Sequence, residues 1–186
     1  MRAPRPSDRV ARRRRALSRR HADLRPAGRG RSETATEAMT TEGIIIERAA
    51  MGDIAAVHAL EQRCFPATWR REFFESEVIT PGRFNLVARR DGVIIAYLFA
   101  AWIVDEMHIN KIAVDAGARR QGIALALMER CTAFAVEQGV TSIWLEVRQS
   151  NEEAQQFYHL LHFEPEYIRK GYYPDGEAAV VMTRDL

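Results

Sequence analysis

Apolar residues recur at helical spacing in four stretches of the chain, and each stretch is bounded by residues that start or stop helices. Asp53 is the predicted N-cap of the first helix. Pro66 ends this helix, because proline has no amide donor and clashes with the preceding turn. The other helices are predicted over Thr68–Val78, from Ile123 to a glycine cap at Gly139, and over Asn151–Leu161 with Ser150 or Asn151 as N-cap.

Shorter apolar runs between and after these helices are typical of β-strands. Asp91-Gly92 separates two of the runs, and this dipeptide is a strong signal for a tight hairpin turn. The predicted strands are Gly43–Arg48, Phe84–Arg90, Val93–Val104, Met107–Val114, Ser142–Val147, Phe163–Lys170 and Ala178–Thr183. Strands and helices in this order predict a mixed α/β sheet covered by helices.

The chain of 186 residues is long enough for one domain with a real core, but its charge is divided unevenly. Residues 1–38 hold 12 Arg and four acidic residues, a net charge of +8, whereas residues 39–186 hold 15 basic and 21 acidic residues, a net charge of −6. The acidic part is poorly suited to gripping phosphate backbones and better suited to basic peptides. We therefore expect a basic leader followed by one domain over residues 39–186.

The leader over residues 1–38 lacks Phe, Trp, Tyr and Ile, a composition typical of disorder. Three hypotheses compete: a nucleic-acid or ribosome-binding tail, an Arg-rich organelle transit peptide, or an upstream extension ahead of a true start at Met39. Asp8 and Asp23 count against a transit peptide, and no apolar stretch follows that would make a secretory signal. We favour the start at Met39, which mass spectrometry of the native N-terminus tests.

Cysteine, histidine and apolar runs exclude several classes of protein. Two cysteines, Cys64 and Cys131, make neither a disulfide framework nor a Cys-x-x-Cys metal site, so we expect both to be reduced. His58, His159 and His162 have no companion ligand at metal-site spacing. No apolar run approaches the ~20 residues that span a bilayer. We expect a cytoplasmic protein with no metal and no membrane contact.

The loop Arg119-Arg120-Gln121-Gly122-Ile123-Ala124 joins a predicted strand to a predicted helix. A helix N-terminus offers unpaired amides and partial positive charge, Gly122 allows close approach of the backbone, and two arginines add charge. The loop is neither a P-loop nor a Gly-x-Gly-x-x-Gly motif, so Mg-nucleotide chemistry is not indicated. These features predict a pyrophosphate cradle, although the loop alone is also compatible with an ordinary connection carrying solvated arginines.

The pattern Arg119-x-x-Gly122-x-Ala124, after a strand ending in Ile112-Ala113-Val114-Asp115, resembles the acetyl-CoA-binding signature of the GCN5-related N-acetyltransferase (GNAT) superfamily. The resemblance implies the GNAT fold, a mixed and mostly antiparallel sheet of about six to seven strands with flanking helices. It also implies acetyl-CoA as cosubstrate, held by Arg119, Arg120, Gln121, Gly122, Ile123 and Ala124. The backbone amides of Ile112, Ala113 and Val114 are expected to pair with the acetyl and pantetheine groups, provided that the strands there splay apart.

Downstream runs resemble the RimI branch of this superfamily, the ribosomal-protein alanine N-acetyltransferases. These runs are Trp144-Leu145-Glu146-Val147-Arg148, Ser150-Asn151, Phe157-Tyr158 and Tyr172-Tyr173-Pro174. The resemblance covers Met39 to Leu186. It implies that the acceptor is the N-terminal alanine of small-subunit ribosomal protein eighteen, a basic protein N-terminus.

Acetyl transfer to an amine requires a base, because an α-amino group with a pKa near ~8 is mostly protonated at neutral pH. Glu146 lies within an apolar strand run, where an acidic residue is expensive to bury unless it is used. The alternative is a glutamate on the solvent face of the strand. The resemblance implies that Glu146 is the base, and His108 is an alternative candidate.

Tyr158 is the predicted general acid, since its phenol with a pKa of ~10 can donate a proton to a departing thiolate. The alternative is core packing with Phe157. By resemblance, Asn151 is expected to contact the pantetheine. Tyr172 and Tyr173 are assigned to the wall of the substrate slot, the alternative being an aromatic hairpin that covers the core.

Two positions depart from the family pattern. His162 stands before Phe163 where the family has Gly, so a residue with a side chain is expected to adopt the left-handed conformation there, at a cost of roughly 1 kcal/mol. Ala124 stands where many relatives carry Gly, which the pattern tolerates. We expect neither to abolish activity.

Other functions remain open from the sequence. A GNAT enzyme of this kind could acetylate other protein N-termini, lysines or a small amine. A non-catalytic acyl-CoA-binding module is an alternative of another class, against which the combination of Glu146 and Tyr158 argues. A nucleic-acid or ribosome contact is expected only through the Arg-rich leader.

Overall fold

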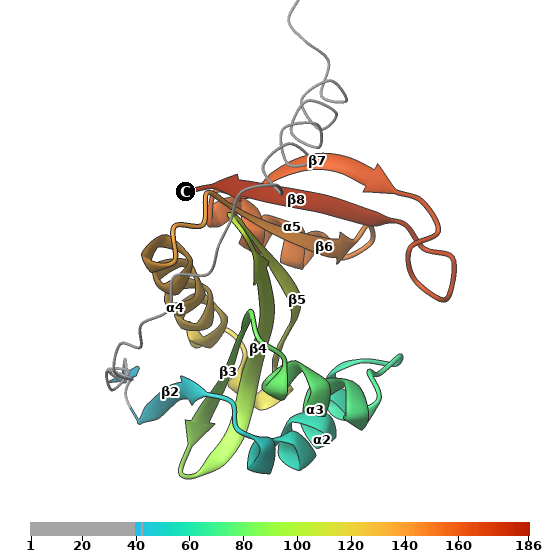
Figure 1. Ribbon diagram of the computed structural model, residues 1–186. Helices are drawn as coiled ribbons and strands as arrows, with labels where there is room; N and C mark the ends of the chain where they lie inside the picture. The colour runs from blue at the N-terminus through green and yellow to red at the C-terminus, as the bar shows by residue number, and fades with distance from the viewer. Residues whose placement is uncertain (1–39, 42) are drawn as a thin grey trace, which may run out of the picture. The chain divides into compact units, whose positions relative to one another are not determined.

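A computed structural model describes residues 40–41 and 43–186 (Figure 1). The leader predicted over residues 1–38 and the predicted start at Met39 lie outside the described residues. The described strands form one sheet in the order β1-β2-β3-β4-β5-β6-β8-β7. Their bounds are β1 Thr40–Thr41, β2 Ile44–Arg48, β3 Arg83–Arg90, β4 Val93–Ile103, β5 Glu106–Val114, β6 Ser142–Arg148, β7 Glu164–Arg169 and β8 Ala179–Asp185.

Every neighbouring pair of strands in this sheet is antiparallel except β5 and β6, which are parallel. The mixed, mostly antiparallel sheet is confirmed, and the seven predicted strands are all present. The two-residue strand β1 is an addition. In the β3–β4 hairpin, Asp91 has φ +50° and Gly92 has φ +78°, as the predicted tight turn requires.

The helices are α2 Ile54–Cys64, α3 Arg71–Ile79, α4 Ile123–Glu137 and α5 Glu152–Leu160, with short 3₁₀ turns η1 Met51–Asp53 and η2 Ala116–Ala118. Asp53 occupies the N-cap position of α2, as predicted, but it is also the last residue of η1 and its side chain makes no capping hydrogen bond to α2. Its carboxylate accepts the backbone amide of Ala50 at 2.9 Å and pairs with Arg89 at 2.5 Å. The second helix begins at Arg71, three residues later than predicted.

Helices cover both faces of the sheet, because side chains along each strand alternate between them. On one face α4 and Tyr158 of α5 pack on a core that includes Leu98, Leu145 and Val147. On the other face α2 and α3 pack on a second core that includes Tyr97 and Phe99. Consecutive residues of β4 therefore belong to different cores. The sheet lies between α4 on one side and α2 and α3 on the other (Figure 1).

Candidate active site

The strands β5 and β6 separate part of the way along their length. Their parallel pairing ends with Ile109 opposite Leu145. At the same level the register between β4 and β5 shifts, so that Asn110 is an extra residue on β5. Such a β-bulge bends its strand and increases the twist. Ile112, Ala113 and Val114 therefore lie beyond the last pair with β6, which is the splayed arrangement that the sequence required for their predicted role.

The cradle loop leads directly into α4. Gly122 is the residue before the helix and has φ +77°, a left-handed conformation that glycine adopts without strain. Apart from its chain neighbours, no protein atom lies within 4 Å of the place that a Cβ atom of Gly122 would take, so the backbone is open to approach on that side. Arg119, Arg120 and Gln121 are exposed around it. Unpaired helix amides, open space and two guanidinium groups fit a pyrophosphate group.

Two members of the predicted cradle have side chains that face the protein. Ile123 is 1% exposed and belongs to the core, so that only its backbone can serve a ligand. Ala124 is half-buried.

Arg120 has φ +62° and pairs with Glu153 on α5 at 2.7 Å, although both side chains are largely exposed. The loop is thus connected to the start of α5.

Asp115 holds the start of this loop. Its carboxylate pairs with Arg63 of α2 at 2.8 Å and accepts the backbone amide of Gly117 at 3.2 Å. These contacts hold the pKa of Asp115 below its ordinary value, the Arg63 hydrogen bond being the larger cause. The carboxylate thus ties the cradle to the helix layer on the opposite sheet face.

Asn151 is the N-cap of α5, as predicted. Its side-chain oxygen accepts the backbone amide of Ala154 at 3.1 Å, which satisfies one of the unpaired donors of the first turn. Ser150, the other predicted cap, binds Glu177 instead. The side chain of Asn151 is exposed at the helix start.

Glu146 is the first residue of β6 beyond its last pair with β5. Its neighbours Leu145 and Val147 point into the core beneath α4, so Glu146 points to the face that carries α2 and α3. Its side chain is 23% exposed, and Arg169 of β7 lies 3.7 Å from its carboxylate. Glu146 is therefore a half-buried carboxylate at the opening between the strands.

Tyr158 lies on α5 and is 7% exposed, with its ring packed against Phe163 at a centroid distance of 5.9 Å. Burial and the phenol of Tyr173 raise the pKa of Tyr158 above its ordinary value, so the hydroxyl keeps its proton at neutral pH. Burial, Tyr172 and the charge of Glu146 raise the pKa of Tyr173 to about 12. Tyr173 is thus within electrostatic reach of both Glu146 and Tyr158.

The β7–β8 loop is clamped over the end of β6 by Arg148. The guanidinium of Arg148 binds Asp175 at 2.8 Å and Glu177 at 2.5 Å, and lies 4.0 Å from the ring centroid of Tyr173. Glu177 in turn accepts the backbone amide and the hydroxyl of Ser150 at 2.9 and 2.7 Å. This clamp brings Tyr173 beside the residues of β6.

Tyr172 lies next to the same carboxylate. Its ring centroid is 4.6 Å from the guanidinium of Arg169, which contacts Glu146, and its side chain is 39% exposed. His108, the alternative base, stacks on Trp144 with 6.4 Å between ring centroids. His108 lies on β5 within the paired part of the strands, opposite Trp144, whereas Glu146 lies at the opening.

The predicted departure at His162 is confirmed in its backbone. His162 has φ +64°, and its amide donates to the carbonyl of His159 at 2.9 Å. The amide of Phe163 donates to the carbonyl of Tyr158 at 3.0 Å. These bonds close α5 in the way that a left-handed residue after a helix allows. His162 thus adopts the left-handed conformation expected of the family glycine, and these hydrogen bonds close α5, the helix that carries Tyr158.

Sequence reasoning missed the ionic partners of the site. Arg169 beside Glu146, the clamp formed by Arg148, and a buried pair between Glu61 and Lys111 were not predicted. Each pair joins residues far apart in the chain, so no local spacing indicates it. Of these residues, only Lys111 stands out in the sequence by its residue type, because the chain has only two lysines among its 27 basic residues.

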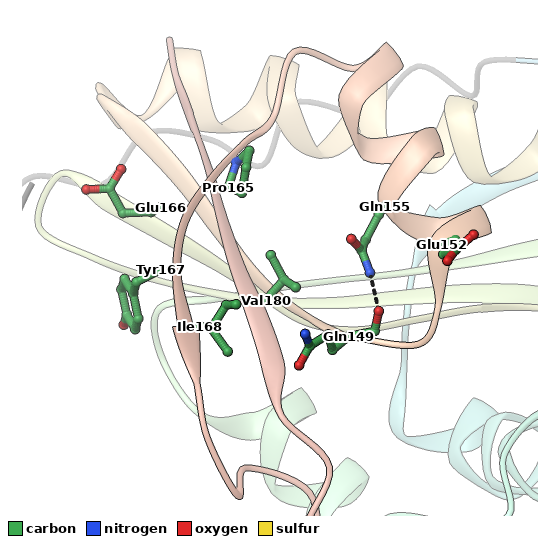
Figure 2. A pocket seen from close by; sticks show the side chains of 8 residues that line it. All are labelled: Gln149, Glu152, Gln155, Pro165, Glu166, Tyr167, Ile168 and Val180. Atoms are coloured by element: carbon green, nitrogen blue, oxygen red, sulfur yellow. Dashed lines mark hydrogen bonds between the residues drawn. The ribbon is translucent and has the colours of Figure 1, made fainter.

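An open depression of about 430 Å³ lies elsewhere, between α5 and β7 (Figure 2). Its lining residues are Gln149, Glu152, Gln155, Pro165, Glu166, Tyr167, Ile168 and Val180. Gln155 crosses its wall, donating to the carbonyl of Gln149 at 2.9 Å. The depression includes none of the predicted site residues and lies on the face toward which Val180 points, opposite to that of Glu146.

Within residues 40–41 and 43–186, no three His, Cys, Asp or Glu side chains are grouped so that they could hold a metal ion. In the same part of the chain, no helix has the length and apolar character needed to cross a bilayer.

Comparison with known proteins matches this chain to the model of the Acetyltransferase (GNAT) family over residues 54–163. The chain is 35% identical over 134 residues to the [ribosomal protein bS18]-alanine N-acetyltransferase of Escherichia coli (strain K12). That alignment covers 70% of this chain and 90% of the relative. It is 34% identical to the putative [ribosomal protein bS18]-alanine N-acetyltransferase of Bacillus subtilis (strain 168), covering 70% of this chain and 87% of the relative.

The fold is similar to the crystal structure of the ribosomal-protein-S18-alanine N-acetyltransferase from Escherichia coli. The TM-score is 0.72 at 32% sequence identity, and the match covers 76% of this chain and 93% of that one.

Proposed function

This chain belongs to the acetyltransferase (GNAT) family, and on that premise we propose that it acetylates the N-terminal alanine of ribosomal protein bS18. The enzyme is an N-acetyltransferase that uses acetyl-CoA. The observation that carries the proposal is the position of Glu146 at the opening between β5 and β6. The anion cradle follows β5 directly, so one end of the opening suits a phosphorylated cofactor while a carboxylate lies at the other.

The cradle fits acetyl-CoA through its open helix start, its left-handed Gly122 and the exposed Arg119 and Arg120. Bound acetyl-CoA supplies an activated acetyl thioester. The backbone of Ile112, Ala113 and Val114, free of β6, offers donors to the acetyl and pantetheine groups. Asn151 keeps its amide nitrogen for the pantetheine, since its oxygen is used in capping α5.

Glu146 acts as the general base. The acceptor arrives as an ammonium, and the carboxylate takes its proton directly or through one water, which leaves a neutral amine to attack the thioester carbonyl. Arg169 lies 3.7 Å from this carboxylate. Base catalysis of this kind contributes roughly 10²–10⁴ in rate.

Tyr158 acts as the general acid. The carbon–sulfur bond breaks as the amide forms, and the phenol donates its proton to the departing thiolate. The second proton that the amine nitrogen loses replaces the proton of the phenol, directly or through water. Because burial and Tyr173 raise the pKa of Tyr158, its proton is present throughout the physiological range. Tyr172 and Tyr173 form the wall of the acceptor slot, held there by Arg148 and Arg169.

The acceptor follows from the relatives and from charge. Residues 39–186 carry a net charge of −6, which suits the basic N-terminus of a ribosomal protein. We place the reaction in the cytoplasm, where ribosomal proteins are made. Other protein N-termini, internal lysines and small amines are the alternative acceptors.

The test uses the full chain, acetyl-CoA and three basic peptides of otherwise identical sequence. One begins with Ala, one with Met, and one has a blocked N-terminus and an internal Lys. We expect mass spectrometry to locate the acetyl group on the α-amino group of the Ala peptide. Transfer only to the lysine would favour the alternative acceptor, and transfer to none of the peptides would refute the proposed function.

A further inference from the structure

A buried ion pair joins α2 to β5 on the sheet face toward which Glu146 points. Glu61 is fully buried, and its carboxylate accepts the hydroxyl of Tyr97 and, at 3.1 Å, the backbone amide of Trp69. Lys111 of β5 completes the set, with its ammonium 2.9 Å from the same carboxylate and its side chain 16% exposed. A buried carboxylate is costly unless it is paired and hydrogen-bonded, so these contacts depend on one another.

The ammonium of Lys111 also lies against two aromatic rings. It is 4.0 Å from the ring centroid of Phe65 and 5.4 Å from that of Trp69. Both rings belong to residues 65–70, the segment between α2 and α3. Cation–π contacts and the Glu61 pair therefore make the side chain of Lys111 a direct link between this segment and β5.

The position of Lys111 connects it with the active site. It follows the bulge residue Asn110, two residues beyond the last pair of β5 with β6, and Glu146 is the first residue beyond that pair on β6. Lys111 and Glu146 therefore lie at the same opening and point to the same face of the sheet. Residues 65–70 border this face on the side of β5, and the loop with Tyr172 borders it on the side of β7.

We propose that Lys111 is a positioning residue for the acceptor: by fastening residues 65–70 it fixes the wall of the acceptor slot opposite Tyr172. This inference rests on the proposed function. The backbone of Lys111 pairs with Phe99 of β4, so the strand keeps its place without the side chain. The lysine side chain therefore sets the affinity for the acceptor and leaves the affinity for acetyl-CoA unchanged.

The experiment measures acceptor and acetyl-CoA kinetics of Lys111→Met in the full chain, with the Ala-first basic peptide as acceptor. We expect KM for the peptide to rise about tenfold while KM for acetyl-CoA changes less than about twofold. This rise lies within the roughly 10²-fold that a 1 Å misplacement of a positioning group can cost. Lys111→Met leaves the buried Glu61 without its counter-ion. The double variant Glu61→Gln/Lys111→Met therefore serves as a second test without a buried charge. It should show the same rise in peptide KM.

Arg83→Met is the matched control. Arg83 forms a comparable ion pair with the buried Glu77 of α3 at 2.9 Å, but none of the aromatic rings of residues 65–70 lies on it. We expect Arg83→Met to lower stability without a selective change in peptide KM. Amide hydrogen exchange supplies a readout that does not depend on activity. Exchange in residues 65–70 should increase in both Lys111 variants and not in Arg83→Met.

The outcomes separate the two hypotheses. If the wild-type enzyme acetylates the peptide and the Lys111 variants have the same KM for the peptide as wild type, the role of Lys111 is refuted. The proposed function then stays intact. An equal rise in the KM for peptide and the KM for acetyl-CoA also refutes the role of Lys111. A wild-type enzyme that acetylates no peptide refutes the proposed function. In that case unchanged exchange in residues 65–70 would also refute the fastening by Lys111.

Discussion

At the scale of single residues, the site depends on carboxylates that are paired differently. Glu146 has one cation at 3.7 Å and keeps 23% of its side chain exposed, so an incoming amine can reach it. Glu61 has three partners and no exposure, so it cannot take part in proton exchange with a substrate. Glu146 is therefore accessible to a substrate, whereas Glu61 is used within the fold as a paired buried carboxylate.

The role of Glu146 leads to a prediction for Glu146→Gln. The amide keeps the shape of the side chain but cannot accept the proton, so kcat should fall by roughly 10²–10⁴. Binding of acetyl-CoA, measured by calorimetry, should stay nearly unchanged. Glu129→Gln, on the exposed side of α4, is the control and should behave as wild type. If Glu146→Gln abolishes acetyl-CoA binding instead, the assigned role is wrong.

At the scale of elements, the β7–β8 loop is ordered by charge rather than by burial. Arg148 and Ser150 hold Glu177, and Asp175 adds a second contact to Arg148. The hydrogen bonds from Ser150 and then from Arg148 lower the pKa of Glu177 to about 2. The order of the loop therefore depends on the ionisation of Glu177.

This dependence predicts how stability changes with pH. A carboxyl whose pKa is lowered on folding contributes stability that is present above the unfolded pKa, here 4.5, and is lost as pH falls toward about 2. Between pH ~5 and ~2.5, wild type should therefore lose more free energy of unfolding than Glu177→Gln, which has no proton to gain. Urea denaturation at both pH values measures the difference. Equal losses in the two proteins would contradict the clamp.

At the scale of the whole molecule, the aromatic packing of α3 joins a helix layer to the sheet. Phe74 is fully buried, and its ring lies 5.8, 5.2 and 5.3 Å from the ring centroids of Tyr97, Phe99 and Trp69. Tyr97 and Phe99 belong to β4, so this ring connects the two layers. Its neighbour Phe73 is 54% exposed and contacts Trp69.

The adjacent phenylalanines make a matched pair for a stability prediction. Phe74→Ala should lower the free energy of unfolding by about 3–5 kcal/mol, because it removes buried apolar surface and leaves a cavity. Phe73→Ala should cost less than about 1 kcal/mol, since over half of that side chain is already in water. Urea denaturation of both variants tests the pair. Similar losses of unfolding free energy in the two variants would mean that Phe74 does not hold the helix layer on the sheet.

Much of the fold and the cofactor loop could be predicted from the sequence, because these features depend on residues close together in the chain. Periodicity predicted the seven full strands and the four helices, and Asp91-Gly92 predicted its turn. The left-handed backbone at His162 was expected from the family pattern, which has Gly at this position. Asp53 takes the predicted N-cap position, but its carboxylate binds the amide of Ala50 and the distant Arg89 instead of the amides of α2.

The amino-acid sequence alone predicted the helices and strands, and together with the family resemblance it indicated the cradle loop and the candidate base and acid. Only the tertiary structure decided which charged side chains lie beside these residues. The bulge at Asn110 separates β5 from β6, and the sheet order brings Arg169 of β7 to Glu146 of β6 across β8. Lys111 reaches Glu61 fifty residues earlier in the chain. The physical reason is that local spacing reports neighbours within a few residues, whereas these pairs depend on strand register and on the packing of whole layers.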